Sequence, residues 1–204
     1  MEGETQRGRV DKTYRPRENS NPVWNASGNK IAYWRTGVPG YFFILDENGT
    51  ILDTLEKMKA RPAYDWSDNE RFALPGSGSD INSYRVGYFD FATEEFTYID
   101  EIGEMNYIYQ AAWGEGNDDI YWAARRKVAK TNIRTGQRTE LAGAPFEVNS
   151  RFYEGITLSP DFKHIVYCRQ NQEKVSDCDW AITYRPYIMN MDGSDEREIV
   201  IPEE

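Results

Sequence analysis

Short apolar segments alternate with polar turns along the chain, and one arrangement of them recurs four times. In each repeat a large apolar anchor residue precedes a turn rich in Gly, Asn, Asp and Ser, and a short apolar segment follows. Apolar segments that flank such a turn predict a β-hairpin. The four anchors are 42, 47 and 45 residues apart. The hairpins join Trp24 to Ile31–Tyr33, Trp66 to Phe72–Leu74, Trp113 to Ile120–Trp122, and Leu158 to Ile165–Tyr167.

A second hairpin follows in every repeat, so each repeat predicts four short antiparallel strands. Four such strands in about 45 residues are typical of a β-propeller blade. We expect an all-β fold, a β-propeller of four-stranded antiparallel blades, with four blades in this chain. The expected blades cover about 21–59, 60–103, 104–147 and 148–202 of a propeller at 21–204. Residues 1–20 form an N-terminal extension, and the weak alternation at 8–15 indicates an extra outer strand there.

The fourth repeat also carries a motif. Ser159-Pro160-Asp161 leads into Ile165-Val166-Tyr167, and Tyr187 to Ser194 reads Tyr-Ile-Met-Asn-Met-Asp-Gly-Ser. These segments strongly resemble the WD40-like β-propeller repeat of TolB-type proteins, which also occurs in propeller domains of prolyl-oligopeptidase-like peptidases. The resemblance covers about residues 21 to 202, and in the second and third repeats the Ser-Pro-Asp-Gly turn has decayed. It implies the fold and little about activity, because this architecture hosts many unrelated functions.

The sequence does not decide whether the four blades close into a ring. A blade that is apolar on both faces buries them by stacking on its neighbours around an axis. We therefore expect the anchors Trp24, Trp66, Trp113 and Leu158 to fill the gaps between blades. Four blades is the low end for propellers, and TolB-like relatives generally have six or more. We favour a closed ring of four blades over an arc that belongs to a larger propeller or that a second copy completes.

Composition and charge narrow the choice of partners. The apolar residues are mainly Tyr, Phe, Trp, Ile and Val, a bias that favours strands. The net charge is −10, whereas a nucleic-acid site needs clustered Lys and Arg, so we expect no nucleic-acid partner. No apolar run approaches the ~18 residues of a membrane span. Residues 1–17 are polar and show no signal-peptide pattern, which leaves the compartment open.

Candidate catalytic and metal-binding groups are few. His164 is the one histidine of the chain and falls in a turn-to-strand position, so a multi-histidine metal site is not expected. The Gly/Ser segment 76–79 lacks the Gly-x-Ser-x-Gly nucleophile pattern. Acidic residues recur at hairpin turns for backbone reasons and do not have EF-hand spacing. We predict no catalytic residue, no metal and no cofactor, and we favour a chain that is not an enzyme.

The least generic part of the chain is the long connection at 169–184 of the fourth repeat, with one cysteine directly before it and one within it. Cys168 and Cys178 either form a disulfide at the base of this excursion or remain two free thiols. A disulfide would favour a periplasmic or extracellular location. The excursion carries Trp180 and Tyr184, and aromatic loops on a rigid scaffold suit recognition.

These observations favour a binding module that engages a protein or peptide through its loop face or axial funnel. Two alternatives stay open. The first is a carbohydrate- or peptide-active propeller enzyme, or the gating propeller fragment of a larger peptidase. The second is a half-ring structural subunit that oligomerisation with further copies completes. The candidate partner-binding residues begin the first strand of each blade or lie in the excursion. They are Asn21, Arg61, Tyr107, Tyr109, Arg151, Tyr153, Glu154, Trp180 and Tyr184.

Overall fold

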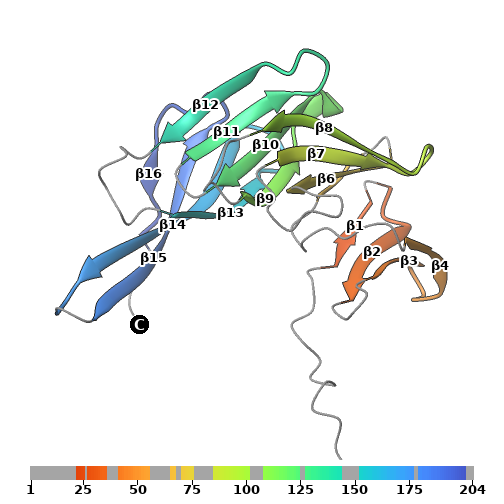
Figure 1. Ribbon diagram of the computed structural model, residues 1–204, viewed down its shortest axis with the longest axis horizontal. Coiled ribbons are helices and arrows are strands. Elements are labelled where there is room, and N and C mark those ends of the chain that lie inside the picture. The colour runs from red at the N-terminus through yellow and green to blue at the C-terminus, as the bar shows by residue number, and fades with distance from the viewer. Residues whose placement is uncertain are drawn as a thin grey trace, which may run out of the picture.

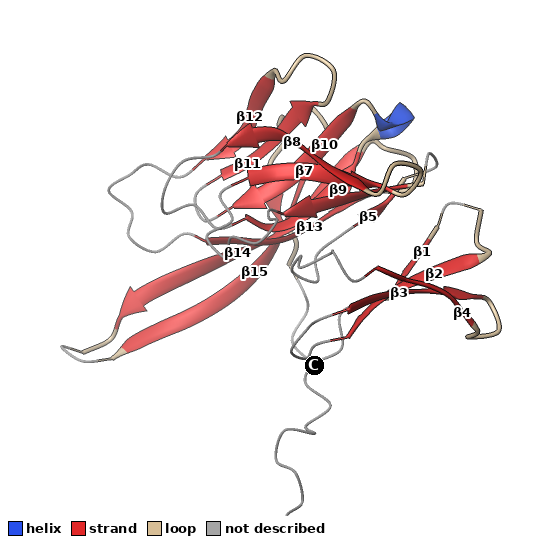
Figure 2. Cartoon of the chain, turned by 45° about the vertical axis from the view of Figure 1, so that its right-hand side comes forward, coloured by secondary structure: helices blue, strands red, loops and turns tan. Residues whose placement is uncertain are grey.

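The structure, a computed structural model of the chain, contains four antiparallel sheets of four strands each (Figure 1 and Figure 2). It describes residues 22–25, 27–35, 41–55, 65–67, 70–75, 85–101, 108–124, 127–143, 152–176 and 179–200. In every sheet the strands pair in chain order, so each sheet is one blade. The predicted all-β architecture of four four-stranded blades is confirmed. The predicted domain limits and the outer strand in the N-terminal extension lie wholly or partly outside the described residues and stay predictions.

Each blade runs from an inner first strand to an outer fourth strand. Blade 1 consists of β1 (Val23–Trp24), β2 (Lys30–Arg35), β3 (Tyr41–Asp46) and β4 (Ile51–Leu55). Blade 2 consists of β5 (Asp65–Trp66), β6 (Arg71–Pro75), β7 (Arg85–Asp90) and β8 (Glu95–Glu101). Blade 3 consists of β9 (Ile108–Trp113), the short 3-10 segment η1 (Glu115–Asn117), β10 (Asp119–Ala124), β11 (Lys127–Asn132) and β12 (Arg138–Gly143). Blade 4 consists of β13 (Phe152–Leu158), β14 (His164–Lys174), β15 (Trp180–Asn190) and β16 (Arg197–Glu198).

The first turn of every blade repeats one backbone conformation. The residue four positions after the anchor has a positive φ in all four blades, and these residues are Gly28, Glu70, Asn117 and Phe162. In blade 4 the Ser159 amide donates to the His164 carbonyl at 2.9 Å, and the Ser159 hydroxyl accepts the amides of Lys163 and His164. A positive φ suits Gly and, less well, Asn, so Glu70 and Phe162 adopt it at a cost of about 1 kcal/mol each.

The second hairpin of every blade turns on an Asp or Asn and a left-handed residue. In blade 1 the Asp46 carboxylate accepts the amides of Asn48 and Thr50, and Gly49 follows at φ +84°. In blade 4 the corresponding turn places Gly193 at φ +88°. Gly193 also touches the neighbouring blade, because a Cβ on it would lie 2.6 Å from the Leu141 carbonyl oxygen of β12. The turn chemistry expected from the sequence is present in both blades.

The core lies between blades rather than inside any one of them. Three clusters of buried residues join blade 1 to blade 2, blade 2 to blade 3, and blade 3 to blade 4. Trp66 is 5% exposed in the first cluster and Trp113 is 3% exposed in the second. Polar contacts also cross between blades: the Trp113 indole N–H donates to the Arg71 carbonyl at 3.1 Å, and the Trp113 amide donates to Asp65 at 2.9 Å. Stacked blades therefore bury each other's faces, as the repeat predicts.

Trp24 departs from this rule. Its side chain is 51% exposed, so the prediction that every anchor fills a gap between two blades is wrong for Trp24 within this chain. The physical reason is that an anchor packs against the preceding blade, and blade 1 has none among the described residues. Blades 1 and 4 lie at opposite ends of the molecule (Figure 1), and no described core cluster joins them. The closed four-bladed ring that we favoured is not seen in the described part of the chain.

The excursion of the fourth repeat is a hairpin rather than an irregular loop. β14 and β15 are 11 residues long each and pair without a break from His164–Asn190 to Lys174–Trp180. The far half of this hairpin extends beyond the blade (Figure 1). No helix in the described part of the chain has the length and apolar character needed to cross a membrane.

Candidate binding pocket at the centre of the arc

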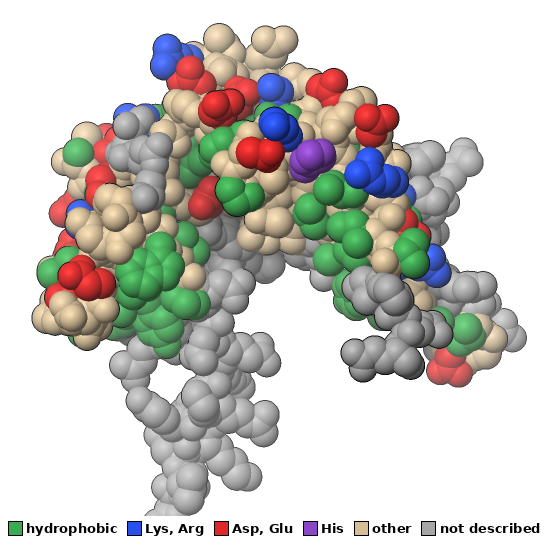
Figure 3. Space-filling model, turned by 180° about the vertical axis from the view of Figure 1, so that it is seen from behind, with side chains coloured by type: hydrophobic (Ala, Val, Ile, Leu, Met, Phe, Trp, Pro, Cys, Tyr) green, Lys and Arg blue, Asp and Glu red, His purple; other side chains and the backbone are tan. Residues whose placement is uncertain are grey.

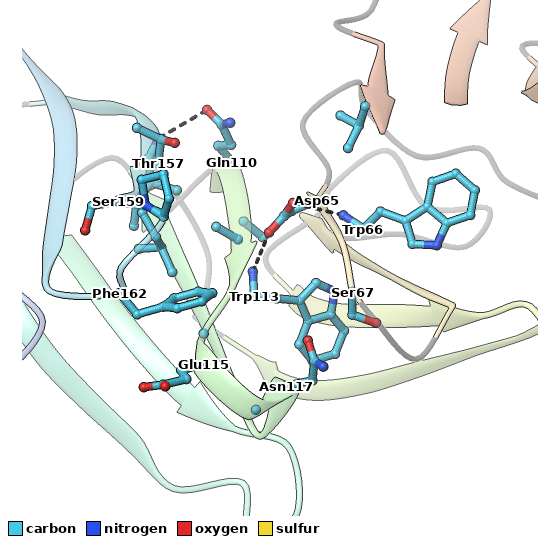
Figure 4. A pocket seen from close by; sticks show the side chains of 18 residues that line it. Asp65, Trp66, Ser67, Gln110, Trp113, Glu115, Asn117, Thr157, Ser159 and Phe162 are labelled. Atoms are coloured by element: carbon cyan, nitrogen blue, oxygen red, sulfur yellow. Dashed lines mark hydrogen bonds between the residues drawn. The ribbon is translucent and has the colours of Figure 1, made fainter. Parts of the chain in front are cut away.

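A pocket of about 500 Å³ lies where the inner strands of the blades meet (Figure 4). The first strands of successive blades contact each other, so side chains from separate repeats converge here. The lining comes from β1, β5, β9 and β13 and from the turns that follow the last three of them. It consists of Val23, Asp65–Ser67, Gln110–Asn117, Ile156–Pro160 and Phe162. The volume is in the range of pockets that hold small ligands or single side chains.

Three aromatic residues, Trp66, Trp113 and Phe162, are among those that line the pocket. Trp66 and Trp113 are anchors that are held rigidly, since each is almost fully buried in a core between blades. Phe162 is partly exposed and extends into the pocket from the first turn of blade 4 (Figure 4). It occupies the turn position where the Ser-Pro-Asp-Gly motif has Gly, and it keeps a φ of +50° there. Glu70 has a similar φ of +53° at the equivalent position of blade 2, so the repeat accounts for this conformation.

Backbone amides fix the polar side chains of the wall. Asp65 accepts the amide of Trp66 at 3.0 Å through one carboxylate oxygen and the amide of Trp113 at 2.9 Å through the other. Gln110 accepts the Ile156 amide at 3.1 Å and so ties blade 3 to blade 4 (Figure 4). Both carboxylate oxygens of Asp65 are therefore held in place by backbone amides of blades 2 and 3.

The pocket is negative. Its described lining residues include the carboxylates of Asp65 and Glu115 and no Lys or Arg. Glu115 is exposed and belongs to η1, at the rim of the pocket (Figure 4). Among the described residues no group of three or more His, Cys, Asp or Glu side chains is placed to hold a metal ion. The arrangement suits a ligand that is positively charged and has some apolar or planar surface.

Five of the binding residues predicted from the sequence belong to described strands. Tyr109 belongs to β9 next to Gln110, while Tyr153 and Glu154 belong to β13. Trp180 begins β15, and Tyr184 is 56% exposed on the same strand. The other predicted residues, Asn21, Arg61, Tyr107 and Arg151, lie outside the described residues, so the predicted set as a whole stays a prediction.

Sequence reasoning missed the pocket residues that the turns contribute. A signal for Phe162 was present, because a bulky residue replaces Gly in an otherwise intact Ser-Pro-Asp turn. No comparable signal marks Gln110, whose position facing blade 4 follows only from the stacking of blades. The Cys168 thiol is free in the structure, and Cys178 lies outside the described residues, so the disulfide also stays a prediction.

Comparisons with known proteins bear on the fold alone. No protein-family model matches the chain, and no curated protein sequence does. Solved structures match at low identity: Kuenenia stuttgartiensis hydrazine synthase (12% identity, TM-score 0.62), the nidogen/laminin complex (10%, 0.62) and puromycin hydrolase (12%, 0.60). They align with 89%, 88% and 89% of this chain, which spans 54%, 64% and 28% of theirs.

The expected resemblance to TolB is also found. A putative TolB from Agrobacterium tumefaciens matches at 12% identity with a TM-score of 0.50, over 90% of this chain and 81% of its own. The TolB-type propeller fold predicted from the repeats is confirmed.

Proposed function

We propose that this propeller binds a peptide segment of a partner protein in the central pocket, and that a basic side chain of that segment occupies it. The observation that carries the proposal is a pocket of about 500 Å³ that combines the partly exposed Phe162 ring with two carboxylates, and that has no Lys or Arg side chain among its described lining residues. An Arg or Lys side chain presents an apolar stem and a charged head, and this lining offers a surface for each.

Binding is favoured over catalysis by the state of the acidic groups. Enzymatic hydrolysis of a glycoside needs one carboxyl group that donates a proton and one that stays ionised. Both carboxylate oxygens of Asp65 accept backbone amides, and Glu115 is exposed at the rim. The pair therefore suits electrostatic attraction of a cation more than proton transfer.

A peptide array followed by titration tests the proposal. Immobilised short peptides of varied sequence would be probed with the full chain, and the best binder would be labelled and titrated by fluorescence anisotropy. We expect the bound peptides to be enriched in Arg and Lys. Enrichment of acidic peptides, or binding that does not depend on charge, would contradict the proposal.

Two variants locate the site. Glu115→Gln should weaken binding up to about fivefold, as expected for one partly exposed charge pair of about 1 kcal/mol. Phe162→Gly should also weaken binding by a few-fold, while its free energy of unfolding stays within about 1 kcal/mol of the wild type because Gly relieves the left-handed turn. Glu47→Gln is the matched control, since Glu47 is exposed in a turn of blade 1 away from the pocket. Unchanged affinity in both pocket variants would place the peptide elsewhere.

A further inference from the structure

Successive blades of the chain pack on each other at three interfaces of the same kind, and each of the two end blades has one face that could form a fourth. In each of the three the anchor of one blade packs against the face of the preceding blade. At the start of the arc, Trp24 is 51% exposed, whereas the equivalent Trp66 and Trp113 are 5% and 3% exposed. Ile51 on the same blade is 57% exposed. This face of blade 1 is the anchor half of an interface.

The outward face of blade 4 is the accepting half. Val166 occupies the position that Ala32, Ala73 and Tyr121 occupy in blades 1 to 3, eight residues after the anchor or seven in blade 2. Those three residues are 0%, 0% and 4% exposed because the following blade covers them. Val166 is only partly buried, and so is Ile188, its partner on β15. Hydrophobic side chains gather toward both ends of the arch in Figure 3.

We propose that two copies of this chain join end to end, with blade 1 of each copy packed on blade 4 of the other, to complete a propeller of eight blades. A second copy supplies both missing halves at once, because each copy brings an anchor face and an accepting face. A twofold axis then closes the assembly and leaves neither terminal face exposed. Eight blades is within the range of known propellers, and the arch in Figure 3 leaves its two ends apart, as half of such a ring requires.

The interface between blades 2 and 3 offers a hydrogen bond that Trp24 can reproduce, although the Trp66 indole N–H makes no such bond at the interface between blades 1 and 2. The Trp113 indole N–H donates to the Arg71 carbonyl, which closes the first turn of blade 2 by accepting the Ser67 amide. The equivalent acceptor in blade 4 is the His164 carbonyl, which accepts the Ser159 amide in the same turn. In the proposed ring the Trp24 indole N–H donates to the carbonyl of His164 of the partner subunit.

The long hairpin extends the accepting face. Side chains alternate between the two faces of a strand, so Ile182 and Tyr184 point to the same side of β15 as Ile188. They are 50% and 56% exposed, and they continue the apolar surface beyond the edge of the blade. The hairpin of one copy would therefore lie along blade 1 of its partner and enlarge the contact.

Light scattering coupled to size exclusion tests the ring with the full chain at micromolar concentration. The expected mass is twice the chain mass of 23.7 kDa. Trp24→Glu and Ile188→Lys should each give a monomer with an unchanged circular dichroism spectrum, because both side chains are at least partly exposed in the single chain. Tyr98→Glu, an exposed aromatic position on the outer strand of blade 2, is the control and should keep the dimer. A monomeric wild type, or a Trp24→Glu variant that stays dimeric, overturns the proposal.

A mixing experiment tests the head-to-tail arrangement itself. In an equimolar mixture of Trp24→Glu and Ile188→Lys chains, a ring of one copy of each has one junction with both native faces and one junction that pairs the two new opposite charges. We expect the mixture to recover the doubled mass that neither variant shows alone. If both variants are monomeric and the mixture stays monomeric, the contact is not between blade 1 and blade 4, and the proposal is wrong.

Discussion

Substitutions of two glycines in equivalent turns can measure backbone strain in the turn separately from the packing of one blade on the next. Gly49 and Gly193 have nearly the same φ, +84° and +88°, in the second turns of blades 1 and 4. A Cβ on Gly49 meets nothing within 4 Å, whereas a Cβ on Gly193 lies 2.6 Å from the Leu141 carbonyl oxygen and 3.1 Å from its Cα. Gly49→Ala therefore adds only the left-handed strain, and Gly193→Ala adds that strain and forces blade 4 away from β12 of blade 3.

General energetics give the expected free-energy costs of the left-handed strain and of the steric clash. Left-handed strain costs an Ala about 1 kcal/mol, and the smaller entropy of the unfolded Ala chain offsets part of it. Moving a backbone carbonyl out of a packed contact costs a further 1–3 kcal/mol or so. We expect Gly49→Ala to lower the free energy of unfolding by at most about 1 kcal/mol and Gly193→Ala by about 2–4 kcal/mol. Urea unfolding followed by circular dichroism measures both, and equal losses would refute the placement of the blade 4 turn on blade 3.

Two further predictions concern buried indoles and acidic turns. The Trp113 indole N–H donates to the Arg71 carbonyl, whereas the buried Trp66 indole N–H has no partner among the described residues. Because Trp113→Phe removes a hydrogen bond and Trp66→Phe does not, Trp113→Phe should lower the free energy of unfolding in urea by about 1 kcal/mol more. The Thr50 amide lowers the pKa of Asp46, and the Ser194 hydroxyl lowers the pKa of Asp192, both below the ordinary 3.8. A carboxylate whose pKa is lower in the folded state stabilises the fold at pH values above its unfolded-state pKa, and this stabilisation is lost as the pH falls through the folded-state pKa. The free energy of unfolding should therefore fall as the pH drops below 3.8. The double variant Asp46→Asn with Asp192→Asn should show a smaller fall in acid unfolding curves.

The sequence predicted the parts of the fold that local chemistry determines. Polar residues with Gly at the turns, and apolar segments on either side, were enough to place the first and second turns of every blade, but not the extended hairpin of β14 and β15. The left-handed conformation of Gly28 and Gly49 follows from residue type. That of Glu70 and Phe162 does not, because these residues adopt it only where the repeat fixes the turn. Position in the repeat was therefore the stronger predictor in those two turns.

The pocket was less predictable because it is assembled from separate repeats. Asp65, Gln110 and Phe162 come from blades 2, 3 and 4, and nothing local in the sequence says that their side chains converge. The predicted binding residues were chosen from the beginnings of first strands and from the excursion of blade 4, whereas the lining includes the turns at the ends of the first strands. Strand beginnings and the turns at strand ends lie on opposite sides of the arc, and the hydrophobic periodicity of the sequence does not indicate from which side a ligand approaches.

The contrast between Trp24 and Trp66 shows why a repeat pattern cannot establish closure. Both are anchors at the same position of their blades, and the sequence assigns them the same role. Their environments differ because burial depends on the preceding blade, which Trp66 has and Trp24 lacks within the described chain. A repeat encodes both halves of each interface in every unit, so in an arc that does not close the first and last units each retain one unused half. An exposed indole at the first anchor is therefore the expected consequence of an open arc, and its burial requires another blade.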